Sequence, residues 1–186
     1  EDFDNVLVAA CKMAILHKKG EEQEAFAAYD SCLQWKDDNV MALNNYAYYL
    51  SEKGVDLHKA ESMSYKTIKA EPNNGTYLDT YAWILFMEER YADAKTYIDQ
   101  ALKNRDSTAD NSTVLEHAGD IYYMNGMTDE SVDFWKKAYT GENQTEVLAW
   151  KIKNRQYITG EELKKRNASK QKPAATKKSV RKGKKK

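Results

Sequence analysis

Apolar residues in this chain recur at the three- and four-residue spacing of helices. The clearest case is TYLDTYAWILF, where apolar positions i, i+3, i+4 and i+7 share one helical face: Leu78, Tyr81, Ala82 and Leu85. Two prolines and eight glycines in 186 residues are too few for the many turns of an all-β protein. The pattern predicts an all-α fold.

A second pattern repeats on a longer scale. Turn residues followed five or six positions later by a small residue occur at Gly20, Gly54, Glu89 and Gly126, which are 34, 35 and 37 residues apart. Glu89 stands in the place of a glycine. A helix pair of this length cannot bury its apolar face alone, so neighbouring units are expected to stack into a common core.

At this period the chain resembles the tetratricopeptide-repeat (TPR) family, whose units are pairs of antiparallel helices. The resemblance covers about residues 6–143. It is best in the third unit, where the family's large and small positions are occupied by Leu78, Tyr81, Ala82, Leu85, Tyr91, Ala94, Ile98 and Ala101. The strings ALNNYAYYL, TYLDTYAWILF and LEHAGDIYYMNG are similar to bacterial multi-repeat TPR proteins, which implies scaffolding rather than catalysis.

The resemblance implies an all-α, TPR-type alpha-solenoid of antiparallel helix pairs with a C-terminal capping helix and a disordered basic tail. The expected segments are a remnant of an upstream segment at 1–5, helix pairs at 6–39, 40–74, 75–108 and 112–143, the capping helix at 144–159 and the tail at 160–186. In the capping helix we expect Lys151, Lys153 and Arg155 to stay solvated. Because no polar cap precedes Val6, we expect further repeats upstream.

Two strings predict where helices start. TYLD, from Thr76 to Asp79, and TVLE, from Thr113 to Glu116, match capping boxes, in which a threonine and an acid satisfy the first free amides of a helix. We therefore expect the first helices of the third and fourth units to begin there.

In the TPR family the concave groove is lined by the first helix of each pair. Carried over position by position, the resemblance implies a partner-binding groove formed by Asn44, Asn45, Tyr48, Asp79, Thr80, Trp83, Phe86, Met87, Glu116, His117, Asp120, Tyr123 and Met124. The family's clamp for a carboxylate needs Lys and Arg, and only Asn45 is of a suitable type, so no clamp is expected. Aromatic, methionine and acidic side chains together favour a peptide or protein partner with apolar or aromatic anchors and basic residues.

An alternative interpretation gives the same residues purely structural roles. The aromatic residues Tyr48, Trp83 and Tyr123 would then pack between repeats. The acids Asp79 and Glu116 would only cap helices.

No catalytic or metal-binding motif stands out. The best catalytic candidate is Glu116-His117-Asp120, but His and Asp three residues apart are common on solvated helices, so we expect no enzyme, no catalytic residue and no cofactor. Cys11 and Cys32 lack the CxxC spacing or clustered histidines of a metal site, so no metal is expected. No apolar run approaches the roughly 20 residues that cross a bilayer.

Charge is divided unevenly along the chain. Residues 164–186 hold 12 Lys and Arg and no acid, whereas residues 1–163 hold 17 Lys and Arg against 29 Asp and Glu. The tail has too few apolar residues to offset its ordering entropy and is expected to be disordered. Its last basic residues are Lys172, Lys177, Lys178, Arg181, Lys182, Lys184, Lys185 and Lys186.

The basic tail supports a second hypothesis, in which the protein tethers itself to nucleic acid or anionic surfaces while the repeats act as a passenger scaffold. Without an aromatic residue for base stacking, such binding would be non-specific and salt-sensitive. The tail is also expected to visit the acidic groove. KPAATKKSVRKGKKK, from Lys172, resembles the bipartite nuclear import signal of nucleoplasmin. The compartment stays open: the bacterial envelope or periplasm if an upstream signal exists, and the cytoplasm otherwise.

Overall fold

The computed structural model describes residues 22–106 and 109–170, and all regular structure in these ranges is helical. This confirms the all-α prediction. The helices are α2 (Glu22–Trp35), α3 (Val40–Lys53), α4 (Leu57–Ala70), α5 (Gly75–Met87), α6 (Tyr91–Asn104), α7 (Ser112–Met124), α8 (Thr128–Ala138), a short 3-10 helix (Gly141–Asn143), α9 (Glu146–Asn154) and α10 (Gly160–Lys170).

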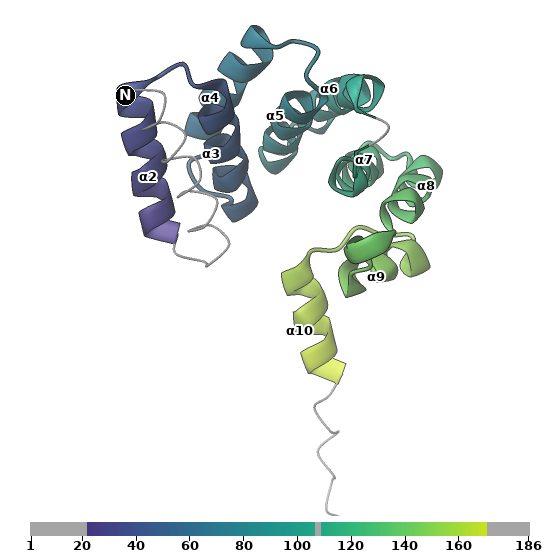
Figure 1. Cartoon of the computed structure of the whole chain (residues 1–186). Helices are drawn as coiled ribbons and strands as arrows, with labels where there is room; N and C mark the ends of the chain where they lie inside the picture. Colours follow the sequence, from purple (N-terminus) through teal and green to yellow (C-terminus); the bar gives the residue numbers. More distant parts are fainter. Residues whose placement is uncertain (1–21, 107–108, 171–186) are drawn as a thin grey trace, which may run out of the picture.

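The helices form an arc of stacked pairs (Figure 1). Helices α3 and α4, α5 and α6, and α7 and α8 pack as pairs, and α3, α5 and α7 also contact their neighbours in turn. These three pairs fall within the units expected at 40–74, 75–108 and 112–143. Of the unit expected at 6–39, the structure describes α2, while residues 1–21 lie outside the described residues.

The turns inside the pairs lie at the positions that the repeat spacing marks. Gly54 and Gly126 adopt left-handed backbone conformations, with φ of 64° and 79°, and Glu89 adopts the same conformation with φ of 61°. Glycine enters this region without a steric penalty, whereas a residue with a Cβ does so at a cost. The glutamate therefore occupies a true turn position of the repeat.

The N-cap residues, Asn74 and Asn111, lie two residues before the threonines of the expected capping boxes. α5 is capped by Asn74, whose side chain accepts hydrogen bonds from the backbone N of Thr76 (3.1 Å) and Tyr77 (3.3 Å). α7 begins at Ser112, whose backbone N donates to Asp110 Oδ1 at 2.9 Å. Both capping-box predictions were wrong because side chains just upstream already satisfy these first amides.

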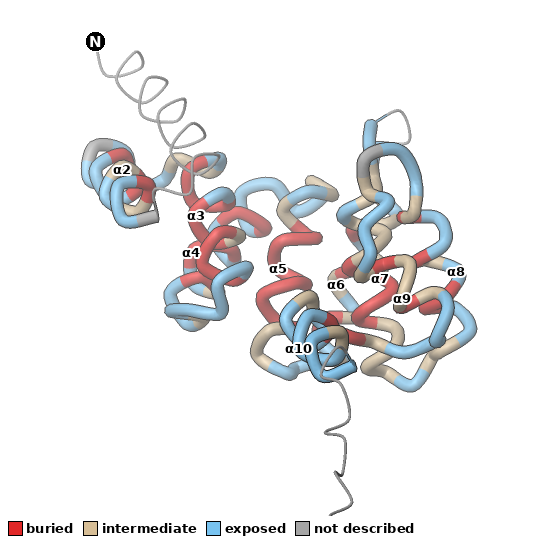
Figure 2. The backbone as a smooth tube through the Cα atoms, turned by 90° about the horizontal axis from the view of Figure 1, so that it is seen from below, coloured by how far each residue is buried: buried red, intermediate tan, exposed pale blue. Residues whose placement is uncertain are grey.

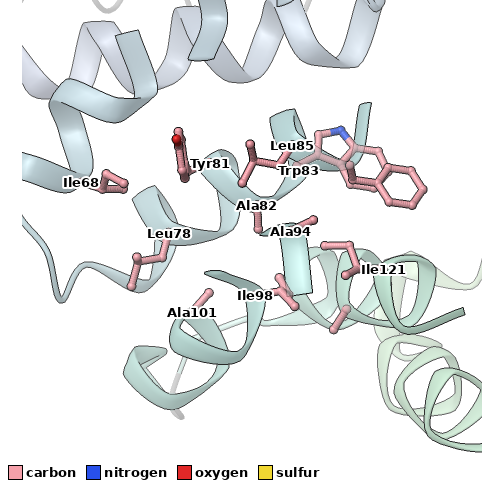
Figure 3. Packing of buried hydrophobic residues seen from close by; sticks show 12 residues of the cluster. Ile68, Leu78, Tyr81, Ala82, Trp83, Leu85, Ala94, Ile98, Ala101 and Ile121 are labelled. Atoms are coloured by element: carbon pink, nitrogen blue, oxygen red, sulfur yellow. The ribbon is translucent and has the colours of Figure 1, made fainter. Parts of the chain in front are cut away.

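Small residues let the helices of the central pair approach closely. Ala82 of α5 and Ala94 of α6 are fully buried, and Figure 3 shows them next to each other, with the ring of Trp83 pointing away from this contact. Leu85 and Ile98 fill the same cluster and have no exposed surface. Buried residues are concentrated along α5, as Figure 2 shows.

The C-terminal part differs from the prediction. The segment expected to be disordered from residue 160 contains a helix, α10. A capping box starts it: the backbone N of Thr159 donates to Glu162 Oε2 (2.9 Å) and that of Glu162 to Thr159 Oγ1 (3.2 Å). Leu163 is buried, and the Arg166 guanidinium lies over the Trp150 ring of α9. Residues 171–186 lie outside the described residues.

The composition of the whole segment misled the prediction, because it averaged one short capped helix with a longer run of basic residues.

No helix within residues 22–106 and 109–170 has both the length and the apolar character needed to cross a membrane.

Candidate functional site

A pocket of about 420 Å³ opens on the side of the array formed by the first helices of the pairs. Its wall comes from α3, α5, α7 and α9 and from residues 157–160, the link to α10. We call it the inner pocket. Six of the thirteen expected groove residues line it: Tyr48, Trp83, Met87, Glu116, His117 and Asp120.

A stack of rings joins α5 to α7 at the base of the inner pocket. The Trp83 indole lies parallel to the His117 imidazole, with centroids 4.1 Å apart and planes 12° apart, and it also stacks on Phe86 at 4.7 Å. His117 Nδ1 lies 3.0 and 3.1 Å from the two carboxylate oxygens of Asp79. Asp79 therefore caps no helix but binds one repeat to the next. Trp83 Nε1 is buried without a hydrogen-bond partner.

Two opposing effects act on the pKa of His117, which is 6 % exposed. Burial lowers the pKa, because it penalises the charged imidazolium. Burial is the largest single effect, but the charge of Asp79, its hydrogen bond and the charges of Glu52 and Asp120 all raise the pKa and together outweigh it. The net result is a pKa above the usual 6.5, so the ring is easier to protonate in the folded than in the unfolded protein.

The raised pKa of His117 predicts a pH dependence of stability. A group whose pKa is higher in the folded than in the unfolded state stabilises the fold fully below the unfolded pKa, and this contribution is lost as the pH rises through the folded pKa. We expect the urea midpoint of the wild-type chain to fall as the pH rises above the ordinary histidine pKa of 6.5. His117→Gln should flatten this dependence. Equal slopes for the two proteins would contradict the assignment.

A buried ion pair joins α7 to α9. Lys151 Nζ lies 2.7 and 2.8 Å from the carboxylate oxygens of Asp120 and 3.1 Å from Glu116 Oε1. Trp135 Nε1 also donates to Asp120 at 2.8 Å. Gly119 makes room for this indole, since a Cβ there would lie 2.3 Å from Trp135 Cδ1. The expectation that Lys151 is solvated was wrong: it is 3 % exposed.

The register of α9 explains this error. The helix has nine residues and starts at Glu146, so Lys151 lies one turn after the buried Leu148 and faces inward with it. Two carboxylates make its burial tolerable, since buried charges are found paired. Burial raises the pKa of Asp120, and the Lys151 ammonium opposes that rise.

The other expected groove residues are placed differently. Asn44, Thr80 and Phe86 are buried, as is Asp79, and none of them lines the inner pocket. Asn45 is exposed, while Tyr123 and Met124 are partly buried and pack against other side chains. The eight basic residues singled out in the tail belong to residues 171–186, outside the described residues.

Sequence reasoning missed part of the wall. Glu52 follows Tyr48 by four residues, so helical spacing alone put both on one face of α3. Tyr157 had no such signal. Tyr157 contacts Phe86 edge to face at 5.8 Å, and Ile158 is 1 % exposed. This link therefore folds back over the helices and closes one side of the inner pocket.

His117 is hydrogen-bonded to a carboxylate, and no described Ser, Thr or Cys side chain bonds its ring, as a nucleophile activated by a histidine does. Within the described ranges, no group of three or more His, Cys, Asp or Glu side chains is placed to hold a metal ion.

Known proteins share this arrangement of helices. No family model matches the chain. A protein of Pseudomonas aeruginosa named as TPR repeat-containing is 35% identical over 66 residues, which are 36% of this chain and 11% of that protein. The P. aeruginosa pilF structure superposes with a TM-score of 0.69 at 14% identity, covering 90% of this chain and 71% of that one. The chain has the TPR fold.

Other TPR structures agree on the fold. PilW, described as a widely conserved type IV pilus biogenesis factor, superposes with a TM-score of 0.67 at 15% identity, over 81% of this chain and 70% of that one. YrrB, described as a TPR protein with an unusual peptide-binding site, gives 0.54 at 18% identity, over 77% and 72%. At these identities the likeness shows the fold alone. The chain spans about a tenth of the length of the curated TPR relative that it matches.

Proposed function

We propose that this protein is a non-enzymatic interaction module and that the inner pocket holds a segment of a partner protein. The observation that carries the proposal is the pocket itself, in which Tyr48, Trp83 and Met87 meet polar side chains of α7. Its volume of about 420 Å³ falls in the range of sites that bind ligands through an apolar wall and a few placed polar groups.

The position of the pocket in the repeat array adds support. α3, α5 and α7 each contribute side chains to it, so a single bound segment would contact three consecutive units. YrrB, a TPR protein described as having a peptide-binding site, has the same fold.

The test is a selection of peptide ligands from a displayed random library against the full chain. We expect selected peptides to lose about tenfold or more in affinity when Tyr48 or Met87 is changed to alanine, because each removes apolar pocket wall. Tyr65→Ala is the matched control, since Tyr65 is 48% exposed on α4 and does not line the pocket. Circular dichroism checks that each variant is folded.

Two outcomes contradict the proposal. One is a set of selected peptides whose affinities are unchanged by both pocket variants. The other is a set whose binding is lost with Tyr65→Ala instead, which would place the binding surface on the outer helices.

A further inference from the structure

We propose that the inner pocket recognises a short partner segment through one lysine or arginine side chain, whose cation is held by Glu52 and Glu116. This rests on the proposed function and names the chemistry of the partner. It also fixes the orientation of the ligand, with the charge toward these two acids and the stem along the apolar wall.

The pocket has more negative than positive charge. Three carboxylates line it, those of Glu52, Glu116 and Asp120, against the single ammonium of Lys151. His117, which also lines the pocket, is paired with Asp79 behind it. Lys151 already serves both Asp120 and Glu116, and Glu52 makes no ion pair with a described residue. A cationic guest would therefore supply the missing positive charge.

Two tyrosines that line the pocket, Tyr48 and Tyr157, are also influenced by its negative charge. Burial raises the pKa of Tyr48, and the charges of Glu52, Asp79 and Glu116 raise it further. Burial likewise raises the pKa of Tyr157, with added contributions from Asp120, Glu162, Tyr91 and Glu116. Each phenol retains its proton more strongly because the nearby acids oppose a further negative charge.

The wall also fits the stem of a basic side chain. Met87 of α5, Val147 of α9 and Ile158 of the link provide apolar surface, along which the methylene groups of Lys or Arg can pack while the charged end stays polar. The faces of Trp83 are engaged by His117 and Phe86. The acids, rather than a cation-π contact with this indole, therefore carry the recognition.

The link after α9 limits the length of the ligand. Residues 157–160 close one side of the pocket, and Tyr157 already occupies the position against Phe86. A volume of about 420 Å³ is that of a site for a drug-sized ligand. The segment bound is therefore a loop tip or a chain end, and not a long helix running across all the repeats.

The experiment compares three capped pentapeptides in nuclear magnetic resonance titrations of the full chain. They share the sequence Gly-Leu-X-Leu-Gly, where X is lysine, arginine or norleucine, the uncharged analogue of lysine. We expect the lysine and arginine probes to shift the amides of Glu52, Met87 and Glu116, and to bind about tenfold more tightly than the norleucine probe, as expected for a charge-assisted contact.

Variants of the acids test the assigned contacts. Glu52→Gln and Glu116→Gln should each weaken the lysine probe several-fold and leave the norleucine probe unchanged. Glu130→Gln is the matched control, because Glu130 is exposed on α8 and does not line the pocket. Added salt should weaken the lysine probe, since the contact is partly open to solvent.

The possible failures are distinguishable. If lysine and norleucine probes bind the pocket equally well, the proposed function stands and the charge recognition is refuted. If all probes bind elsewhere or not at all, both proposals fail. If the lysine probe binds only to a full-length variant in which every Lys and Arg of residues 171–186 is changed to Gln, the pocket is a site for the chain's own basic segment, and the partner assignment is overturned.

Discussion

Lys151→Met is expected to lower the free energy of unfolding by about 3 to 5 kcal/mol, the usual cost of removing one member of a buried ion pair. The methionine fills a similar volume, so the loss comes from charge. Asp120, 3 % exposed, would keep its carboxylate without the ammonium that now bonds both of its oxygens at 2.7 and 2.8 Å. Glu116 would lose the same partner.

Urea denaturation followed by circular dichroism measures this effect. Lys153→Met is the matched control, because Lys153 is exposed on the same helix, and it should change the free energy by no more than about 0.5 kcal/mol. Lowering the pH should reduce the loss in Lys151→Met, since a protonated Asp120 needs no cation. Equal effects of the two substitutions would show that Lys151 is not buried as described.

Leu85→Ala is expected to cost about 2 to 5 kcal/mol, because it leaves a cavity in a packed core. Leu85 has no exposed surface, and it lies in the cluster that joins α5 to the two helices that follow it in the chain, α6 and α7. Because α7 belongs to the next unit of the array, the loss should spread beyond the pair formed by α5 and α6.

Thermal and urea unfolding of Leu85→Ala give the measurement. Met41→Ala on α3 is the control, since Met41 is 46% exposed and its truncation should cost about 0.5 kcal/mol or less. A Leu85→Ala protein as stable as Met41→Ala would contradict the central position assigned to α5.

Much of the fold was predictable because its signals are local. The spacing of turns fixed the repeat, and the left-handed backbone of Gly54, Glu89 and Gly126 lies at the marked positions. Helix starts were less predictable, since Asn74 and Thr76 compete to cap one helix and only the structure decides between them. α10 was not predicted because the average composition of the basic segment hid the capping box at which this helix starts.

The candidate site was predictable only as a helix face. Repeat register placed Tyr48, Trp83 and Met87 on the same side of the array, and they line one pocket. The burial of Lys151 depends on how α9 docks against α7. The position of Tyr157 depends on a link that folds back over α5. Both contacts join residues that are far apart in the sequence.

The two roles considered for Trp83, lining the groove and packing between repeats, do not exclude each other. Trp83 lines the inner pocket, yet it is 9% exposed and stacks on His117 of the next repeat. One side chain therefore serves both roles, and its replacement would confuse binding with stability. Tyr48 and Met87, which are partly exposed, are better positions at which to test binding alone.

The crystal structure of the full chain with a selected peptide ligand tests the central claim most directly. The account predicts the peptide in the inner pocket, contacting Tyr48 and Met87, with a lysine or arginine nitrogen within hydrogen-bond distance of Glu52 or Glu116. A peptide bound on the outer surface formed by α4, α6 and α8, with the inner pocket unchanged, would contradict it.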